Sequence, residues 1–178
     1  MTFEEMALNR QSTRSFSDKE VKEEILVKIC DIARLSPSAC NSQPWKLHIV
    51  KNAKEKVQAV TKACQVGGLN KFLNEVNNYI VIEQVFGNTS AKLGSTFGQN
   101  DLNSIDLGIL TSYICFAAMQ EGLGTCILGA FRKNVIQKAM GFNKKQIVRI
   151  VIAVGYPKDG YPIRKKVRKE LKDILEIK

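Results

Sequence analysis

The chain has 178 residues, of which 44% are hydrophobic and 25% are charged, as in an ordinary globular protein. Its net charge of +10 favours an anionic partner, such as a phosphorylated small molecule or a nucleic acid. Five cysteines without a C-x-x-C pair argue against a zinc ribbon and a disulfide framework, and a single histidine argues against most His-based metal sites. His48 is the single histidine, so we expect any catalysis to depend on a bound cofactor.

The sequence also indicates a cellular location. Its first ten residues include two acids and no long apolar run, which argues against a signal peptide. The most apolar helical stretch, 109–119, is short for a bilayer and carries Thr111 and Ser112. We therefore expect a soluble, cytoplasmic protein with no membrane partner, folded as one domain over 1–178.

Two capping-box patterns lie near the N-terminus. Thr2-x-x-Glu5 predicts a short first helix, and Ser17-x-x-Glu20 predicts a second helix whose apolar residues recur at helical spacing. This second helix should end before Pro37, because the residue that precedes a proline avoids the helical region.

The next elements alternate between strand and helix. Residues 36–44 read as an ordered polar loop, 45–50 as a strand, 52–64 as a helix, 72–75 as one helical turn and 79–86 as a strand.

The middle of the chain contains a polar segment followed by a strongly apolar one. Residues 87–103 have little periodicity, which is typical of an active-site lid. Residues 104–120 are apolar on nearly every face and predict a helix buried in a core or in a subunit interface. Glycines at 122 and 124 end this helix, and 125–128 is a short apolar segment.

The last third of the chain predicts a helix at 133–139 and a strand at 146–154. The tail at 164–178 is basic, and its stretch 165–177 is amphipathic. The alternation of helices and strands favours a sheet that helices cover.

Three polar segments could bind a ligand. In the first, RQSTRSF at 10–16, two arginines flank a hydroxyl and suit an anionic group, although an exposed loop has the same pattern. In the second, PSACNSQPW at 37–45, side-chain amides could read the edge of a planar ring, or the segment could be a turn. In the third, GLGTCILG at 122–129, glycines allow close approach to a ligand or simply end a helix.

Together, in this order and spacing, these segments resemble the nitroreductase family. A strand followed by VGYP and a basic stretch (IRKKVRKEL) completes the pattern, and the resemblance covers about 7–174. It implies an α+β fold, a three-layer α/β/α sandwich with a central mixed, mostly antiparallel sheet. It also implies an intertwined homodimer that binds FMN at the dimer interface.

The resemblance further implies a set of cofactor-binding positions. These are Arg10, Gln11, Ser12, Arg14, Pro37, Ser38, Asn41, Gln43, Asn70, Ile127, Leu128, Gly129, Arg164 and Lys166.

Several of these positions carry an implied role. Arg10 and Ser12 match positions that hold the FMN phosphate, and the basic pair Arg164 and Lys166 matches two more, with room for a register slip within RKKVRK. Arg14 matches the basic position near flavin N1 and O2, where a fixed positive charge favours the reduced, anionic ring.

The remaining positions match the flavin ring side of the family's site. Pro37, Ser38 and Asn41 match a loop that the partner subunit supplies, and Gln43 belongs to the same motif. Asn70 matches a position that faces the pyrimidine edge of the ring.

Leu128 and Gly129 match a pair whose backbone N–H groups face flavin N5 and O4. Leu73 stands where some family members have a second lysine near N1, so Arg14 would act alone.

The implied function is an FMN-dependent oxidoreductase without a catalytic side chain. It would pass two electrons from NADH or NADPH, through flavin N5, to a planar electron-poor acceptor in a ping-pong scheme. Nitroaromatics, quinones and activated alkenes are candidate acceptors. Alternatives are a flavin storage or sensing protein and, with less support, a basic nucleic-acid binder, for which the sequence contains no helix-turn-helix, zinc-finger or RNP pattern.

Overall fold

The computed structural model describes residues 1–86 and 100–178. In chain order, its helices and strands are α1 (Phe3–Asn9), α2 (Glu23–Ala33), β1 (Trp45–Val50), α3 (Lys54–Cys64), β2 (Asn78–Gln84), α5 (Leu102–Gln120), β3 (Gly124–Leu128), α6 (Lys133–Met140) and β4 (Ile147–Gly155). Short 3-10 turns lie at Ala39–Asn41, Val66–Gly68, Lys71–Glu75 and Leu171–Asp173.

The strands form a four-stranded sheet in the order β1-β2-β4-β3. Neighbouring strands in it are antiparallel, with pairs such as His48 opposite Val81 and Thr125 opposite Val154. A parallel bridge between Ser12 and Thr125 adds the segment that precedes α2 to the β3 edge. This bridge is the parallel component of an otherwise antiparallel sheet.

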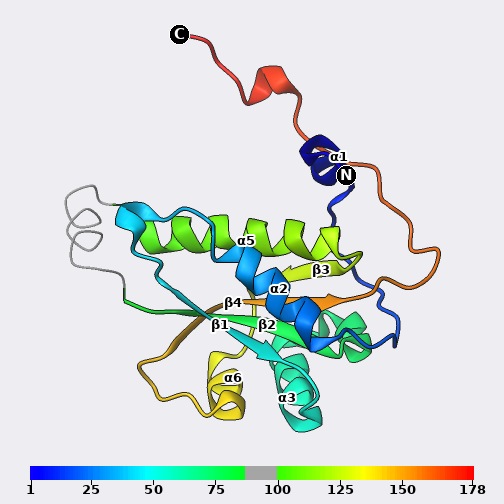
Figure 1. Ribbon diagram of the computed structural model, residues 1–178, viewed down its shortest axis with the longest axis vertical. Coiled ribbons are helices and arrows are strands. Elements are labelled where there is room, and N and C mark those ends of the chain that lie inside the picture. Colours follow the sequence, from blue (N-terminus) through cyan, green and yellow to red (C-terminus); the bar gives the residue numbers. More distant parts are fainter. Residues whose placement is uncertain (87–99) are drawn as a thin grey trace.

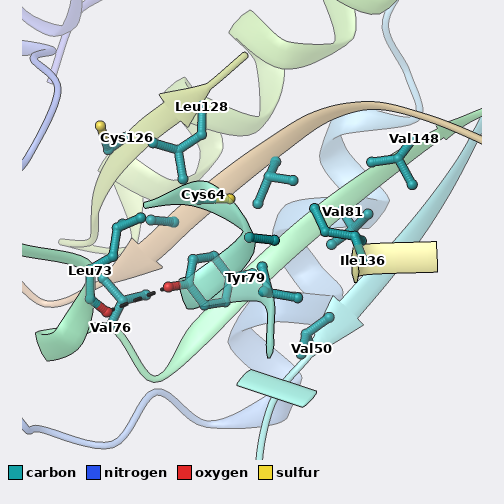
Figure 2. Packing of buried hydrophobic residues seen from close by; sticks show 14 of the residues in the cluster. Val50, Cys64, Leu73, Val76, Tyr79, Val81, Cys126, Leu128, Ile136 and Val148 are labelled. Atoms are coloured by element: carbon teal, nitrogen blue, oxygen red, sulfur yellow. Dashed lines mark hydrogen bonds between the residues drawn. The ribbon is translucent and has the colours of Figure 1, made fainter. Parts of the chain in front are cut away.

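Helices cover both faces of the sheet (Figure 1). Side chains of β2 alternate between the faces, as the two-residue period of a strand requires. Tyr79 and Val81 pack with α3 and α6 in the core of Figure 2, whereas Ile80 and Ile82 pack with α2 and α5. The architecture is thus the expected three-layer α/β/α sandwich.

The second predicted capping box is wrong. Helix α2 begins at Glu23, and its N-cap residue, Lys22, makes no side-chain capping bond. Ser17 instead donates its backbone N–H to the carbonyl of Tyr156, and the carboxylate of Glu20 pairs with Lys51 at 2.8 Å. These long-range bonds hold 17–20 outside the helix. The first box, at Thr2 and Glu5, is confirmed at the start of α1.

The C-terminal tail forms no amphipathic helix. Its regular structure is the single turn Leu171–Asp173, and the tail extends away from the layered body past α1 (Figure 1). Val167 and Ile177 are 85% and 90% exposed, because no apolar face of the described chain receives them.

Helix α5 is long and apolar enough to cross a membrane by length and composition, but it lies over the sheet and packs beside α2. Core helices of soluble proteins pass the same test. Its side chains Ile105 and Tyr113 remain 53% and 39% exposed. The predicted lid at 87–103 lies mostly outside the described residues, and its last two residues already belong to α5.

Candidate cofactor site

The arginine-rich segment 10–16 lies along the β3 edge of the sheet. The backbone N–H of Thr13 donates to the carbonyl of Thr125 at 2.8 Å, next to the parallel bridge at Ser12. A Cβ on Gly124 would lie 2.3 Å from Thr13 Oγ1, so this close approach requires glycine at 124. Gly124, the first residue of β3, thus allows the segment to approach the sheet.

The start of the C-terminal tail is bonded to the same segment. Gln11 donates from Nε2 to the carbonyl of Pro162 at 2.8 Å, and its Oε1 accepts from Arg164 N at 3.0 Å and Nε at 3.2 Å. Arg164 Nη2 donates to the carbonyl of Ser12 at 2.6 Å, and Lys166 Nζ donates to the carbonyl of Arg10. The basic pair named from the sequence therefore meets the first motif, although some 150 residues separate them in the chain.

Beside these contacts lies a cationic cavity of about 260 Å³ that is open to solvent. Its lining contains no carboxylate. Desolvation, together with the charges of Arg10, Arg168 and Arg164, lowers the pKa of Lys166. Clustered positive charges without a carboxylate suit a phosphate group, whose oxygens accept several charge-assisted hydrogen bonds. The lining residues are Arg10, Gln11, Ser12, Arg164, Lys165, Lys166, Val167 and Arg168.

Two residues that the sequence did not single out hold the segment around Arg14. The hydroxyl of Tyr161 accepts the backbone N–H of Arg14 at 3.0 Å. The carboxylate of Glu75 accepts from the backbone N–H of Phe16 at 2.9 Å and from the Ser15 hydroxyl at 3.2 Å. No local sequence pattern marks either residue, since both act across the fold.

The Arg14 side chain is exposed, and its positive charge acts on Cys126 in β3. Burial raises the pKa of the Cys126 thiol, and the charge of Arg14 and the hydroxyl of Ser12 partly offset this rise. The structure therefore places a cation beside the strand that leads to Leu128.

The end of β3 at Leu128 lies about 10 Å from the Ser12–Thr125 bridge, at a strand rise of about 3.3 Å per residue. Leu128 is buried against the core in Figure 2, whereas Ile127 is 39% exposed and Gly129 is exposed. A Cβ on Gly129 would meet nothing within 4 Å, so open space lies beside this backbone. This backbone therefore lies at the opposite end of β3 from the Ser12–Thr125 bridge.

Asn70 has a structural bond of its own. It adopts a left-handed conformation (φ 58°) before the turn Lys71–Glu75, and its Nδ2 donates to the carbonyl of Cys64 at 3.0 Å. The amide nitrogen thus caps the end of α3, and a ligand could engage the side chain through its oxygen.

The second motif lies elsewhere in the fold. Pro37, Asn41 and Gln43 are exposed, and Ser38 is half-buried. The loop is attached to the beginning of α5, where Asp106 Oδ1 accepts the backbone N–H of Ala39 at 3.1 Å. From Asp106 to the end of α5 is about 21 Å, at 1.5 Å per helical residue. One chain therefore does not bring this loop together with the cationic cavity.

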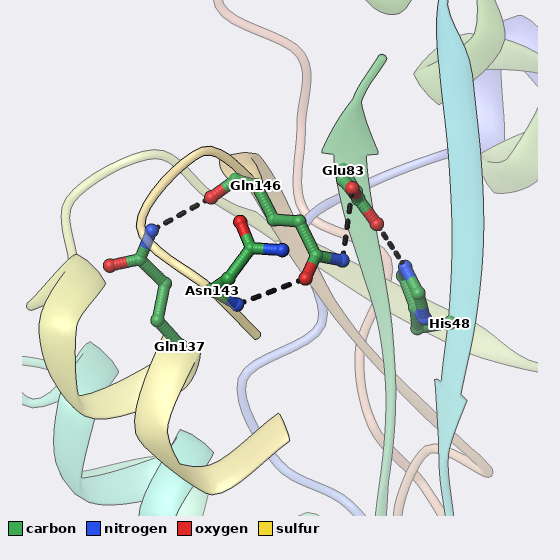
Figure 3. Close-up of polar contacts among 5 residues, drawn as sticks. All are labelled: His48, Glu83, Gln137, Asn143 and Gln146. Atoms are coloured by element: carbon green, nitrogen blue, oxygen red, sulfur yellow. Dashed lines mark hydrogen bonds and ion pairs between the residues drawn. The ribbon is translucent and has the colours of Figure 1, made fainter. Parts of the chain in front are cut away.

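His48 is not among the residues that line the cavity, and it takes part in the polar contacts of Figure 3. Its Nε2 is 2.7 Å from the carboxylate of Glu83, which also accepts from Gln146 Nε2 at 3.2 Å. The imidazole packs on the ring of Phe142 with 4.7 Å between centroids. His48 is thus held between a carboxylate and an aromatic ring.

The three-layer α+β fold matches known structures over nearly the whole chain. A nitroreductase family protein from Streptococcus pneumoniae TIGR4 superimposes with a TM-score of 0.83 at 21% identity, covering 99% of this chain and 100% of that one. A protein from Exiguobacterium sibiricum 255-15, provisionally described as a nitroreductase in complex with FMN, gives 0.80 at 20% identity, covering 100% and 98%. These likenesses establish the fold.

The sequence profile of the nitroreductase family matches residues 7–156, and the chain belongs to this family. A protein from Archaeoglobus fulgidus, provisionally named NADH dehydrogenase/NAD(P)H nitroreductase, is 29% identical over 86% of this chain and 84% of its own length. An iodotyrosine deiodinase from Hydra vulgaris is 26% identical over 93% of this chain and 69% of its own length. Family membership supports an oxidoreductase as the general class of this protein.

Proposed function

We propose that this protein is an FMN-dependent oxidoreductase that takes two electrons from NADH or NADPH and passes them to a planar, electron-poor acceptor. The observation that carries the proposal is the cationic cavity, where 10–12 and 164–168 place guanidinium and ammonium groups together without a carboxylate. The FMN complex of the Exiguobacterium sibiricum structure and the NAD(P)H nitroreductase name of the archaeal relative support the same choice.

In this proposal the chain's residues bind and orient the cofactor. Arg10, Ser12, Arg164 and Lys166 hold the phosphate, and Gln11 fixes the geometry of Arg164.

Arg14 lies beside the ring and favours its reduced, anionic form. The backbone at Leu128 and Gly129 lines the ring from the β3 end, with Ile127 next to it, and Asn70 contributes its amide oxygen. Bound FMN would supply hydride acceptance and two-electron transfer at N5, for which no side-chain acid or base is required.

The working form in this proposal is a cytoplasmic homodimer. An 18-residue window of α5 has a mean hydropathy of 1.4, yet 44% of the window is buried within one chain. Exposed apolar side chains such as Ile105 and Tyr113 then face a second copy. A partner would also supply Pro37, Ser38, Asn41 and Gln43 to the site, because one chain holds these residues far from its own cavity.

Donor and acceptor would occupy the same space over the ring in turn, which predicts ping-pong kinetics. Nitroaromatics, quinones and activated alkenes are the proposed acceptors. The relatives suggest two further probes: 4-nitrobenzoate, from a Pseudomonas putida reductase matched over 27% of this chain, and iodotyrosine, from the Hydra vulgaris deiodinase.

The first test is the visible absorbance of the purified protein, followed by anaerobic addition of NADH or NADPH. A yellow protein that bleaches and recovers its colour with a quinone or a nitroaromatic supports the proposal. A yellow protein that no nicotinamide nucleotide bleaches points to flavin storage or sensing. A colourless protein that binds no added FMN contradicts the proposal and makes salt-sensitive nucleic-acid binding the next measurement.

A further inference from the structure

Asp106 is a buried carboxylate with one hydrogen-bond partner among residues 1–86 and 100–178. It lies in α5 with 3% of its surface exposed, and its Oδ1 accepts the backbone N–H of Ala39 at 3.1 Å. Its Oδ2 is buried and has no hydrogen-bond partner among 1–86 and 100–178. Burying a carboxylate without a cation is costly, so its presence needs a reason beyond packing. Helix capping is not that reason, because Asp101 is the N-cap residue of α5.

The loop that Asp106 contacts has an unusual backbone. Cys40, Asn41 and Gln43 have φ values of 51°, 50° and 46°, in the left-handed region that favours glycine. Such a conformation costs about 1–2 kcal/mol per residue, so the loop needs compensating bonds to persist.

Most bonds of this loop are internal. Asn41 N donates to the carbonyl of Ser38 at 3.0 Å, and Gln43 N donates to Ser38 Oγ at 3.0 Å. Gln43 Nε2 donates to Asn41 Oδ1 at 3.2 Å. Bonds within the loop fix its shape but do not place it relative to the rest of the fold.

Bonds near both ends connect the loop to other elements: Ser36 N donates to the carbonyl of Ala33 at 3.0 Å, Trp45 N to that of Gln43 at 2.7 Å, and Val85 N to that of Pro44 at 3.1 Å. In the middle of the loop, Ala39 N donates to Asp106 in α5. The hydroxyls of Ser36 and Ser42 are buried and make no hydrogen bond within the described chain. The Ala39–Asp106 bond therefore links the middle of the loop to α5.

We propose that Asp106 is a positioning residue that holds the loop 36–44 in the conformation that receives the flavin ring. This inference rests on the proposed FMN function. The carboxylate touches no cofactor atom in the proposal. It acts through Ala39 on Ser38 and Asn41, which would face the ring across the dimer interface.

The test measures FMN and riboflavin affinity by quenching of flavin fluorescence, using the full chain stripped of flavin. Asp106→Ala should weaken FMN binding roughly 10-fold or more, the scale expected for losing a hydrogen bond to a charged group. It should weaken riboflavin binding by the same factor, because the loop serves the ring and not the phosphate. Asp106→Asn keeps an oxygen that accepts the Ala39 N–H and should restore most of the affinity.

Two further variants separate positioning from folding. Asp101→Ala removes an acid five residues earlier in the same helix and should lower the melting temperature without changing flavin affinity. Ala39→Pro removes the donor and leaves Asp106 in place, so α5 is untouched. Proline suits the first position of a helical turn, and the extended backbone of Ser38 (φ −145°, ψ 153°) suits a residue before proline.

Ala39→Pro should weaken the binding of both flavins as Asp106→Ala does. The double variant should bind them no more weakly than either single variant. Wild-type flavin affinity in Ala39→Pro and Asp106→Ala overturns the inference while leaving the function standing. Failure of Asp106→Asn to restore affinity also overturns it. Absence of flavin binding in the wild type would instead remove the proposed function, and the inference with it.

Discussion

Thr13 occupies the space in which a side chain at position 124 would begin, since a Cβ on Gly124 would lie 2.3 Å from Thr13 Oγ1. We expect Gly124→Ala to push the segment 10–16 away from β3. The free energy of unfolding should fall by about 1–3 kcal/mol, as in other overpacked sites, and FMN affinity should fall with it. Urea denaturation and flavin fluorescence measure the two effects.

Gly129→Ala is the matched control for stability. A Cβ there meets nothing within 4 Å, so the urea midpoint should remain that of the wild type. Equal destabilisation by both alanines would show that the contact with Thr13 is not the cause.

The bond from Arg164 to the carbonyl of Ser12 leads to a separate prediction about binding of the FMN phosphate. Arg164→Ala should raise the dissociation constant of FMN about 10- to 100-fold, because a charge-assisted partner of the phosphate is lost. Riboflavin, which has no phosphate, should bind almost as before. Lys172→Ala, in the exposed turn of the same tail, serves as control. A parallel loss of riboflavin binding would contradict a phosphate role.

Assembly can be tested on the exposed face of α5. Tyr113→Glu places a charge on an apolar surface, and we expect sedimentation velocity to show a shift from dimer to monomer together with loss of FMN binding. Val66→Glu, at the same exposed fraction of 39% but on the opposite layer of the fold, should remain dimeric. A wild-type monomer that binds FMN would contradict the shared site.

Glu75 makes the stability of the segment 14–17 dependent on pH. The backbone N–H of Phe16, then the Ser15 hydroxyl and Lys158, lower the pKa of this carboxyl below its ordinary 4.5. A depressed folded-state pKa contributes stability above the unfolded value, which is lost as the pH falls through the folded value. Because Glu75 is 39% exposed, we expect Glu75→Gln to cost less than about 1 kcal/mol at pH 7.

That difference between Glu75→Gln and the wild type should shrink below pH 4.5 and vanish in stronger acid. Melting temperatures recorded from pH 7 to pH 3 provide the measurement. Glu170→Gln, in the exposed tail, should follow the wild type throughout. A difference that persists unchanged at low pH would contradict the assignment.

The His48–Glu83 pair in Figure 3 predicts a loss of stability without a loss of function. The two side chains are 17% and 7% exposed, and His48→Ala would leave the Glu83 carboxylate with Gln146 as its remaining partner. We expect a cost of about 2–4 kcal/mol in urea denaturation with unchanged FMN affinity. Lys46→Ala, an exposed residue on the same strand, should cost little. Lost turnover at wild-type stability would instead indicate proton transfer by His48.

Local sequence patterns determined much of this fold. The capping box at Thr2, the β-branched and aromatic residues of β2, and the glycines that follow α5 are all features of residues a few positions apart. The first and third motifs could likewise be recognised from local patterns in the sequence. In the fold they lie beside one another at the β3 edge. Such features can be predicted from the sequence because the interactions that stabilise them lie within one turn or one strand.

Only the tertiary structure decided the rest. Helix α2 begins after 17–20 because Ser17 and Glu20 bond to distant residues, and the tail stays extended where no apolar surface receives it. Glu75, Tyr161 and Asp106 act on segments far away in the chain, so no local pattern marked their roles. The separation of the loop 36–44 from the cationic cavity follows from the length of α5, a distance in space that the order of motifs in the sequence does not contain.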